Sequence, residues 1–377
     1  MSYELQLASG IFRIPIEIRR AIYADLINTA GIHITLSAQG GVQLTRCLEP
    51  DLAAGNVGDE RRPPGEWAPN RLIWARRVDS SWGPHWECEE TALAKFKEGH
   101  EDSQGTSGCS FLTICKRLYF EIQSWMSEQM CYHMTDLAAA SRLLNPNIAS
   151  LGTLGSPELS FIHSLLPNTT KLDIILSLPL AFFQHFQPHP STQDEDGEEV
   201  QHLKVLAETW LALPQSLGNR LPNLRRLRIW LDHTDRSYWS VVDERAVLRH
   251  FEQLARSPHL DLSCDLPKLH PLQEDPARHF VNNDVVGESG SSSSLPPIQV
   301  RRRLRQRWRA KRTDVGYGWP YWVRDFPLAF GTAWFIDVSL EELEQLEKTM
   351  ELEGIRMEEL LSNAQHLSGP TLADIHP

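Results

Sequence analysis

The sequence has no apolar run that approaches the roughly 18 residues needed to span a bilayer. Its first ten residues also lack the basic segment and the apolar run of a secretory signal. We therefore expect an intracellular protein, cytoplasmic or nuclear, that has no membrane partner.

Paired cysteine spacings are missing as well. The six cysteines are scattered along 377 residues, and no Cys-x-x-Cys motif occurs. Cys131-Tyr-His133 is one close Cys/His pair without a second half, which is more typical of a core thiol beside an imidazole than of a metal site. We therefore expect free thiols in a reducing compartment and no metal ligand.

Signatures of common enzyme classes are also absent. The Gly105-Thr-Ser-Gly108 segment has no lysine and does not follow a clear strand, so it does not match a phosphate-binding loop. The Gly-x-Ser-x-Gly elbow of hydrolases does not occur. We predict a non-enzymatic protein with no catalytic residue and no cofactor. A hydrolase or transferase whose site is assembled from distant residues is a third, weaker hypothesis.

The composition indicates a folded chain with a substantial core. Hydrophobic residues make up 41% of the sequence, and its 12 tryptophans are large side chains to bury. The length predicts two domains, or one domain with insertions. The formal net charge of −12 argues against nucleic-acid binding over the whole surface.

An amphipathic helix is predicted over residues 13–27. A proline suits its first turn, and isoleucine and leucine then recur at four-residue spacing on one face. This helix must dock either onto its own domain or onto another protein. The residues of its apolar stripe are Pro15, Ile18, Ile22 and Leu26.

Further regular elements are predicted in the first half of the chain. Alternating apolar residues with a glycine turn predict a β-hairpin over residues 32–48. Residues 49–110 lack a pattern, and we predict a partly disordered insertion there, with disorder over 50–66. Apolar stripes at helical spacing predict helices over 110–126 and 135–144.

The second half contains an internal repeat. Residues 166–176 and 221–231 share the pattern Leu-Pro-Asn-x-x-x-Leu-x-Ile-x-Leu. Each copy is typical of a strand that follows a Pro-Asn turn. An amphipathic helix follows each copy, and residues 260–264 predict a third strand. The order of elements predicts a parallel βαβαβ unit.

The C-terminal part combines a linker with segments of opposite charge. Residues 282–300 are rich in Gly, Ser and Pro and predict a disordered linker. The aromatic residues of 317–335 predict a buried strand or core packing. A capping box at 339–342 opens a strongly acidic helix.

A basic run over residues 301–312 is the sharpest local signal. Three interpretations stay open: a nuclear localisation signal, a contact with nucleic-acid phosphates, or a solvated helix, alone or paired with the acidic C-terminal helix. The basic residues are Arg301, Arg302, Arg303, Arg305, Arg307, Arg309, Lys311 and Arg312.

Two helical motifs resemble those of a known family. Residues 14–18, Ile-Pro-Ile-Glu-Ile, resemble the first helix of an F-box. Residues 112–121, Leu-Thr-Ile-Cys-Lys-Arg-Leu-Tyr-Phe-Glu, and the strand within 166–176 follow in the order seen in F-box-like domains of uncharacterised fungal proteins, a DUF7730-like family. The resemblance covers roughly residues 11–265. It implies a protein-interaction module that docks a Skp1-type adaptor of a ubiquitin ligase.

Together these observations predict an α/β protein of mixed α+β character. An N-terminal helix and hairpin pack on helices and on a small parallel βαβαβ sheet, followed by an aromatic strand and an acidic helix. The best functional hypothesis is a non-enzymatic interaction protein with residues 13–27 as the partner surface. The alternative is a nuclear or nucleic-acid-associated protein that acts through the basic run. The predicted divisions are 1–48, 49–110, 111–281, 282–300 and 301–377.

Overall fold

The computed structural model confirms the α/β mixed fold class. Among the helices it describes, none combines the length and the apolar character that a membrane crossing requires. The described residues are 10–27, 31–36, 42–48, 80–97, 116–144, 157–187, 197–235, 239–269, 273–281, 298–303, 306–309, 312–313, 316–317 and 321–324.

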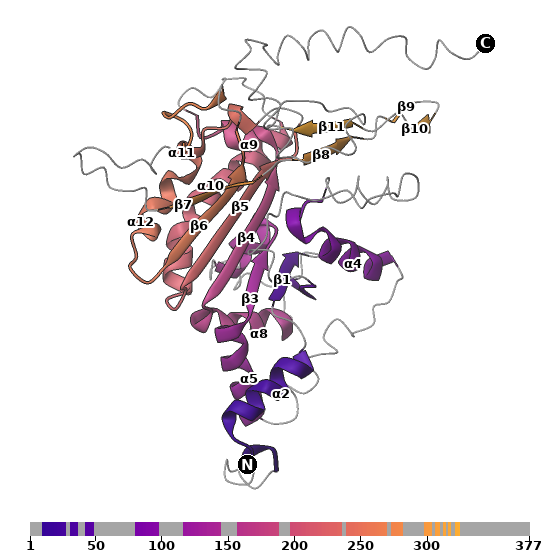
Figure 1. Ribbon diagram of the computed structural model, residues 1–377, viewed down its shortest axis with the longest axis vertical. Coiled ribbons are helices and arrows are strands. Elements are labelled where there is room, and N and C mark those ends of the chain that lie inside the picture. The colour runs from indigo at the N-terminus through magenta and orange to yellow at the C-terminus, as the bar shows by residue number, and fades with distance from the viewer. Residues whose placement is uncertain are drawn as a thin grey trace, which may run out of the picture.

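One seven-stranded sheet forms the centre of the fold (Figure 1). Its strands are β1 (Gly31–Leu36), β2 (Val42–Arg46), β3 (Cys131–Met134), β4 (Lys171–Leu178), β5 (Arg226–His233), β6 (Asp261–Pro267) and β7 (Gln299–Arg303). Their spatial order is β2-β1-β3-β4-β5-β6-β7. The hairpin strands β1 and β2 pair antiparallel, and every other neighbouring pair in this sheet is parallel.

Helices connect β3 to β4, β4 to β5 and β5 to β6, and they contribute buried apolar residues to the main core. The α-helices are α2 (Ile16–Ile27), α4 (Trp86–Lys97), α5 (Lys116–Gln129), α6 (Leu137–Leu144), α8 (Pro157–Leu165), α9 (Leu180–Gln184), α10 (Glu198–Arg220), α11 (Glu244–Leu248) and α12 (Glu252–Ala255). Short 3-10 helices are η1 (Gly10–Arg13), η2 (Gly83–His85), η4 (Leu166–Asn168), η5 (Trp239–Val241) and η6 (Arg249–Phe251). The long helix α10 lies behind the sheet in Figure 1 and contacts α6, α9 and α12. Its Trp210 is buried and donates its indole N–H to the carbonyl of Val247 at 2.9 Å.

Side-chain alternation along the strands makes the two faces of the sheet different. One row of aligned residues belongs to the main hydrophobic core: Ile34, Met134, Ile174, Ile229 and Cys264. The row one residue earlier in each strand is polar and buried: His33, His133, Asp173, Arg228 and Ser263. Because neighbouring residues of a strand point to opposite faces, the second row forms a polar face opposite the core.

The internal repeat of the sequence sets the register of two central strands. β4 and β5 pair in parallel from Lys171 opposite Arg226 to Leu178 opposite His233. This register has the same offset as the sequence repeat, so equivalent positions of the two copies lie side by side. The two Pro-Asn turns also touch, since Asn223 donates to the carbonyl of Pro167 at 2.8 Å.

The sheet is larger than the predicted βαβαβ unit. The hairpin is part of it, because β1 pairs with β3, whereas the sequence predicted a hairpin packed on helices and on the parallel sheet, outside that sheet. Strand β7 pairs with β6, and Ile298 before it is buried. The sheet therefore continues across the predicted boundary at residue 300, and the first part of the basic run belongs to the body.

Part of the predicted insertion is ordered. Residues 80–97 form η2 and α4, whereas 50–66 lies outside the described residues. Beyond the main sheet, Tyr321–Arg324 (β11) pairs with Gln306–Arg309 (β8), and the two-residue strands β9 (Arg312–Thr313) and β10 (Gly316–Tyr317) pair with each other. β11 falls in the predicted aromatic strand, and the predicted acidic helix lies outside the described residues.

Candidate functional site

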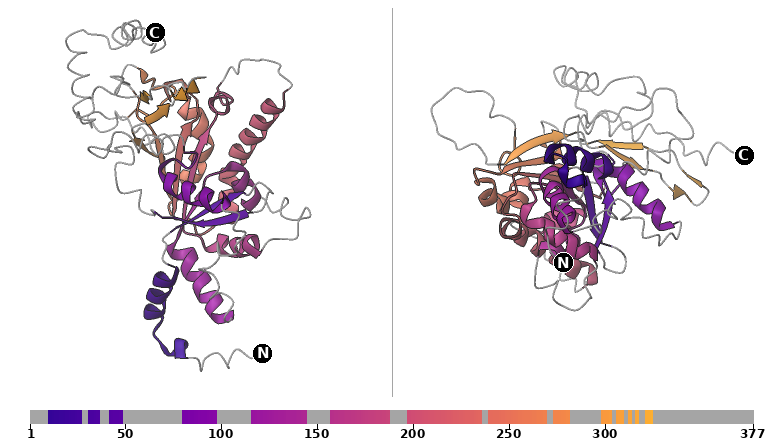
Figure 2. Two further views of the ribbon diagram at one scale, coloured as in Figure 1. Left: turned by 90° about the vertical axis from the view of Figure 1, so that its right-hand side faces the viewer. Right: turned by 90° about the horizontal axis from the view of Figure 1, so that it is seen from below.

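Helix α2 projects with α5 from one end of the sheet (Figure 1 and Figure 2) and is attached by polar contacts. Arg19 pairs with Glu121 of α5, with Nε–Oε2 and Nη2–Oε1 distances of 2.9 and 3.0 Å. Tyr23 donates its hydroxyl to the same carboxylate at 3.0 Å, and its ring packs edge-on against Trp125. Arg19 and Tyr23 are both buried, so this face of α2 is occupied by α5.

The predicted apolar stripe of α2 lies beside the anchoring residues, because Pro15 and Ile22 are within one turn of Arg19 and Leu26 is within one turn of Tyr23. Ile18 is 53% exposed and Leu26 is 56% exposed. Pro15 is also exposed, and Ile22, next to the anchoring face, is half-buried. The structure thus leaves most of the predicted stripe open to solvent along one edge of the contact with α5. Ile18 and Leu26 do not serve the internal core.

The anchoring carboxylate is held in its charged form. Burial raises the pKa of Glu121, but hydrogen bonds from Arg19 and Tyr23 and the positive charge of Arg19 outweigh this and leave the pKa below its usual range. Burial and the contact with Glu121 raise the pKa of Tyr23 to about 12, so the phenol stays a donor. The attachment of α2 therefore depends on a charged network.

We expect Arg19→Ala to lower the free energy of unfolding by about 2 kcal/mol, because Glu121 and Tyr23 lose a charge-assisted partner in a buried setting. Amide hydrogen exchange should accelerate most in α2. The matched control is Arg20→Ala, since Arg20 is exposed and pairs with Glu128 at 3.3 Å, and we expect a loss below about 0.5 kcal/mol there. Equal effects of the two substitutions would contradict the anchoring role.

The described residues of the basic run lie in strands β7, β8 and β9 and not in a helix, and side chains are described in β7 only. Arg301 is exposed. Arg302 pairs with the buried carboxylate of Glu244, with Nη1–Oε1 and Nη2–Oε2 distances of 2.5 and 2.8 Å. The guanidinium of Arg303 lies 3.9 Å from the ring centroid of Trp230. Two of these three arginines therefore hold the fold together. The side chains of Arg305, Arg307, Arg309, Lys311 and Arg312 fall outside the described part of the structure.

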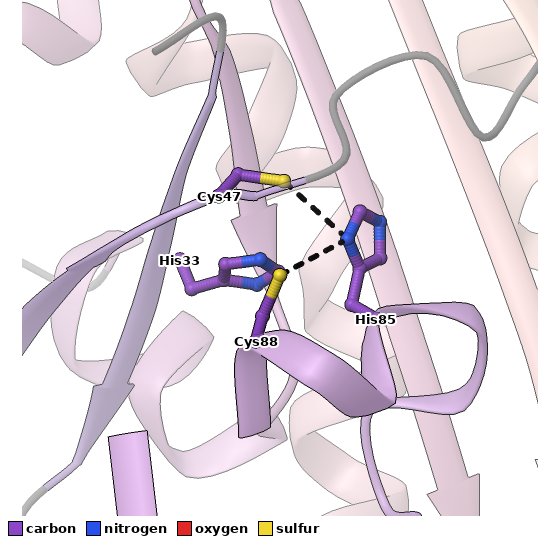
Figure 3. Close-up of side chains that lie close together, drawn as sticks. All are labelled: His33, Cys47, His85 and Cys88. Atoms are coloured by element: carbon purple, nitrogen blue, oxygen red, sulfur yellow. Dashed lines mark hydrogen bonds between the residues drawn. The ribbon is translucent and has the colours of Figure 1, made fainter. Parts of the chain in front are cut away.

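A second set of chemically active side chains lies at the β1 edge of the polar face. His33 lies in β1, Cys47 follows β2, His85 ends η2, and Cys88 lies in the first turn of α4 (Figure 3). All four are buried, and one ligand atom of each lies within 4.8 Å of the others. We call these four residues the His/Cys cluster.

The close approach of η2 to the sheet needs a glycine, because Gly83 has a φ of 53° and faces the ring of Trp230.

Both sulfur atoms of the His/Cys cluster converge on one nitrogen (Figure 3). The Nδ1 atom of His85 lies 3.4 Å from Sγ of Cys47 and 3.9 Å from Sγ of Cys88. The backbone N–H of Leu48 donates to Cys88 at 3.3 Å. The hydrogen bond from Cys47, supported by the two histidines and by Leu48, lowers the pKa of Cys88 to about 2 against the effect of burial. The site therefore favours a thiolate at Cys88.

His33 contributes a buried imidazole close to Cys88. Its side chain is 0% exposed, and neither ring nitrogen makes a hydrogen bond of good geometry among the described residues. The ring stacks against Trp82 and His133, with centroid distances of 4.7 and 4.8 Å. Burial lowers the pKa of His33, so the ring is neutral and has a lone pair to offer.

The neighbouring group of Cys131, His133 and Asp173 has different surroundings. Arg226 donates to Sγ of Cys131 at 3.3 Å and lies 3.9 Å from Asp173. Nδ1 of His133 lies 3.6 Å from the Asp173 carboxylate. Burial raises the pKa of Cys131 and of Asp173. The guanidinium of Arg226 already lies beside Cys131 and Asp173. This arrangement fits the interpretation of Cys131 as a core thiol.

Sequence reasoning did not identify the His/Cys cluster, and it predicted no metal ligand. Long, unequal stretches of chain separate His33, Cys47 and the His85/Cys88 pair, and the stretch between Cys47 and His85 lacks a pattern. The one local signal is His85-x-x-Cys88, which alone is too short to indicate a site. Only the pairing of β1 with β2 and the return of residues 80–97 to the hairpin bring the ligands together.

Comparison with known proteins gives one match. The family described as domain of unknown function DUF7730 matches residues 4–269, which is well over half of the chain. No curated protein and no solved structure matches this chain. The matched region includes α2, the hairpin, the His/Cys cluster and the sheet as far as β6. The chain therefore belongs to the DUF7730 family.

Proposed function

We propose that this protein is a non-enzymatic, F-box-like interaction module, and that α2 docks a Skp1-type adaptor of a ubiquitin ligase. The observation that carries the proposal is the exposed apolar stripe of α2. Its contact residues are Pro15, Ile18, Ile22 and Leu26.

The stripe has the form that a groove-binding helix needs. Ile18, Ile22 and Leu26 follow one another at four-residue spacing, which places them on one face over more than two turns. A helix that lays such a face into an apolar groove binds through these anchors. Ile18 and Leu26 are each more than half exposed, so a partner would remove most of their surface from water.

The anchoring residues of α2 support the same function. Arg19 and Tyr23 hold the helix to Glu121, so it is presented to a partner already ordered. An ordered helix loses less conformational entropy on binding than a free segment does. The choice of a Skp1-type adaptor as the occupant comes from the resemblance of residues 14–18 to the first helix of an F-box.

The test is direct binding of the purified full-length chain to a purified Skp1-type adaptor by calorimetry. We expect a 1:1 complex with the wild type and at least about tenfold weaker binding of Ile18→Asp/Leu26→Asp, since two apolar anchors become charged. Because both positions are exposed, the variant should fold. The control is Val200→Asp/Val205→Asp, which places the same charges at exposed apolar positions of α10. No binding of the wild type, or equal binding of all three proteins, would disprove the proposal.

The alternative function at the basic run has less support. Two of its three described arginines are engaged, Arg302 with Glu244 and Arg303 with Trp230. Of the described side chains in the run, Arg301 alone is exposed. A nucleic-acid contact would therefore rest on Arg301 and on residues beyond 303.

A further inference from the structure

The His/Cys cluster is a complete ligand set for one metal ion. We infer that His33, Cys47, His85 and Cys88 bind a single Zn²⁺ in a tetrahedral structural site. Two thiolates and two imidazoles are a set that closed zinc sites use. Sulfur ligands also select zinc against the hard ions Mg²⁺ and Ca²⁺, which prefer oxygen.

The distances fit such an ion. With Zn–S and Zn–N bonds of about 2.3 and 2.0 Å, a sulfur and a nitrogen of one tetrahedron lie about 3.5 Å apart. The two sulfur distances to Nδ1 of His85, 3.4 and 3.9 Å, fall on either side of this value. All four ligand atoms lie within 4.8 Å of one another, so small side-chain adjustments bring them onto one centre.

The chemistry of the cluster also favours a metal ion. His33 is fully buried and its ring nitrogens lack hydrogen bonds of good geometry among the described residues, which is costly for a polar group. A zinc ion bound at one of these ring nitrogens would remove that cost.

The site is closed, which makes it structural and not catalytic. Four protein ligands take all four positions of a tetrahedral ion and leave none for water or substrate. The Trp82 ring stacks on the imidazole of His33 and covers one face of it. The neighbouring Cys131 group also has ring nitrogens without hydrogen bonds of good geometry, those of His133, but there Arg226 already supplies a positive charge beside Cys131 and Asp173.

Zinc at this place would hold residues 80–97 against the hairpin. The apolar contacts there are few, because Cys47, Trp82, Cys88 and Ala92 form a small cluster separate from the main core. Small cores of this kind commonly depend on a metal or a disulfide. The ion would join β1, the end of β2, η2 and α4 across the long segment between Cys47 and His85. This inference is independent of the adaptor proposal, since α2 contributes no ligand.

The first experiment uses the wild-type full chain, purified under reducing conditions without chelator. We expect one zinc per chain by elemental analysis. X-ray absorption at the zinc edge should show two sulfur atoms at about 2.3 Å and two nitrogen atoms at about 2.0 Å. Replacement by Co²⁺ should give the visible absorption of tetrahedral cobalt together with a thiolate charge-transfer band.

Two serine variants then locate the ion. Cys88→Ser should weaken zinc binding at least about 100-fold in a chelator competition, because it removes a ligand. Cys131→Ser changes an equally buried cysteine of the neighbouring group and should keep one zinc per chain with unchanged affinity. If Cys88→Ser does not fold, the zinc site is still tested by the zinc stoichiometry and X-ray absorption of the wild type and by the zinc content of Cys131→Ser.

Three results would overturn the inference. The first is a folded, reduced wild type that neither carries zinc nor binds it when added. The second is a bound ion with fewer than two sulfur ligands, and the third is loss of the ion in Cys131→Ser but not in Cys88→Ser. A Cys47–Cys88 disulfide that forms in place of metal binding under reducing conditions would count as the first of these.

Discussion

Arg302→Ala is expected to lower the free energy of unfolding by about 3–5 kcal/mol, because it leaves a buried carboxylate without its counter-charge. The carboxylate of Glu244 is 0% exposed and meets the Arg302 guanidinium at 2.5 and 2.8 Å. Arg302 also donates to the carbonyls of Pro267 and Phe280. The loss therefore affects several acceptors in addition to the ion pair.

Urea unfolding of three variants separates this role from a general effect of charge. Arg301→Ala, one residue away and exposed, should change stability by less than about 0.5 kcal/mol. Arg302→Met/Glu244→Gln should recover part of the loss, because no charge is then buried alone, while the amide can still accept from Trp239. Equal stability of Arg301→Ala and Arg302→Ala would show that the pair does not hold β7 on the sheet.

Gly31→Ala is the second substitution with a large expected effect, about 3 kcal/mol of destabilisation. A Cβ atom at Gly31 would lie 2.5 Å from Nε2 of His133, 3.0 Å from Cβ of Cys47 and 3.1 Å from the carbonyl oxygen of Cys131. His133 is fully buried and packs against the rings of His33 and His85, with little room to yield. The added methyl group must therefore displace backbone or the His/Cys cluster.

The matched control is Gly218→Ala in α10. The atom nearest to a Cβ added at Gly218 is a side-chain atom of Leu254, 4.0 Å away, so the methyl group fits without a clash. Alanine inside a helix is favoured over glycine by about 0.5–1 kcal/mol, and we expect stabilisation of that order. Thermal and urea unfolding of both variants measure the difference. A neutral Gly31→Ala would mean that β1 can separate from β3 at little cost.

The parts of the fold that were predicted from sequence are those with local signals. The helix at α2, the hairpin and the two copies of the Leu-Pro-Asn repeat each carry their own periodicity or turn residues. The size of the sheet was not predicted, because β7 is made of arginines. A strand of Arg301, Arg302 and Arg303 is stable only where Glu244 and the ring of Trp230 receive the guanidinium groups.

The two candidate sites differ in the same way. The apolar stripe of α2 follows from a single helical period, and the structure then decided that Ile18 and Leu26 face outward, since Arg19 and Tyr23 take the inner face. The His/Cys cluster has no such period. Its ligands come from a strand, a strand end, a 3-10 turn and a helix, and only strand pairing and chain return place them within reach of one ion.

The sequence by itself thus determined the helix at α2, the hairpin, the strands of the two repeat copies with the offset at which they pair, and the family of the chain, because these depend on neighbours a few residues apart or on a repeated segment. The tertiary structure alone decided that β7 joins the sheet, which face of α2 is free, and which histidines and cysteines meet. Those outcomes depend on burial and charge pairing between residues distant in the chain, and no local pattern encodes them.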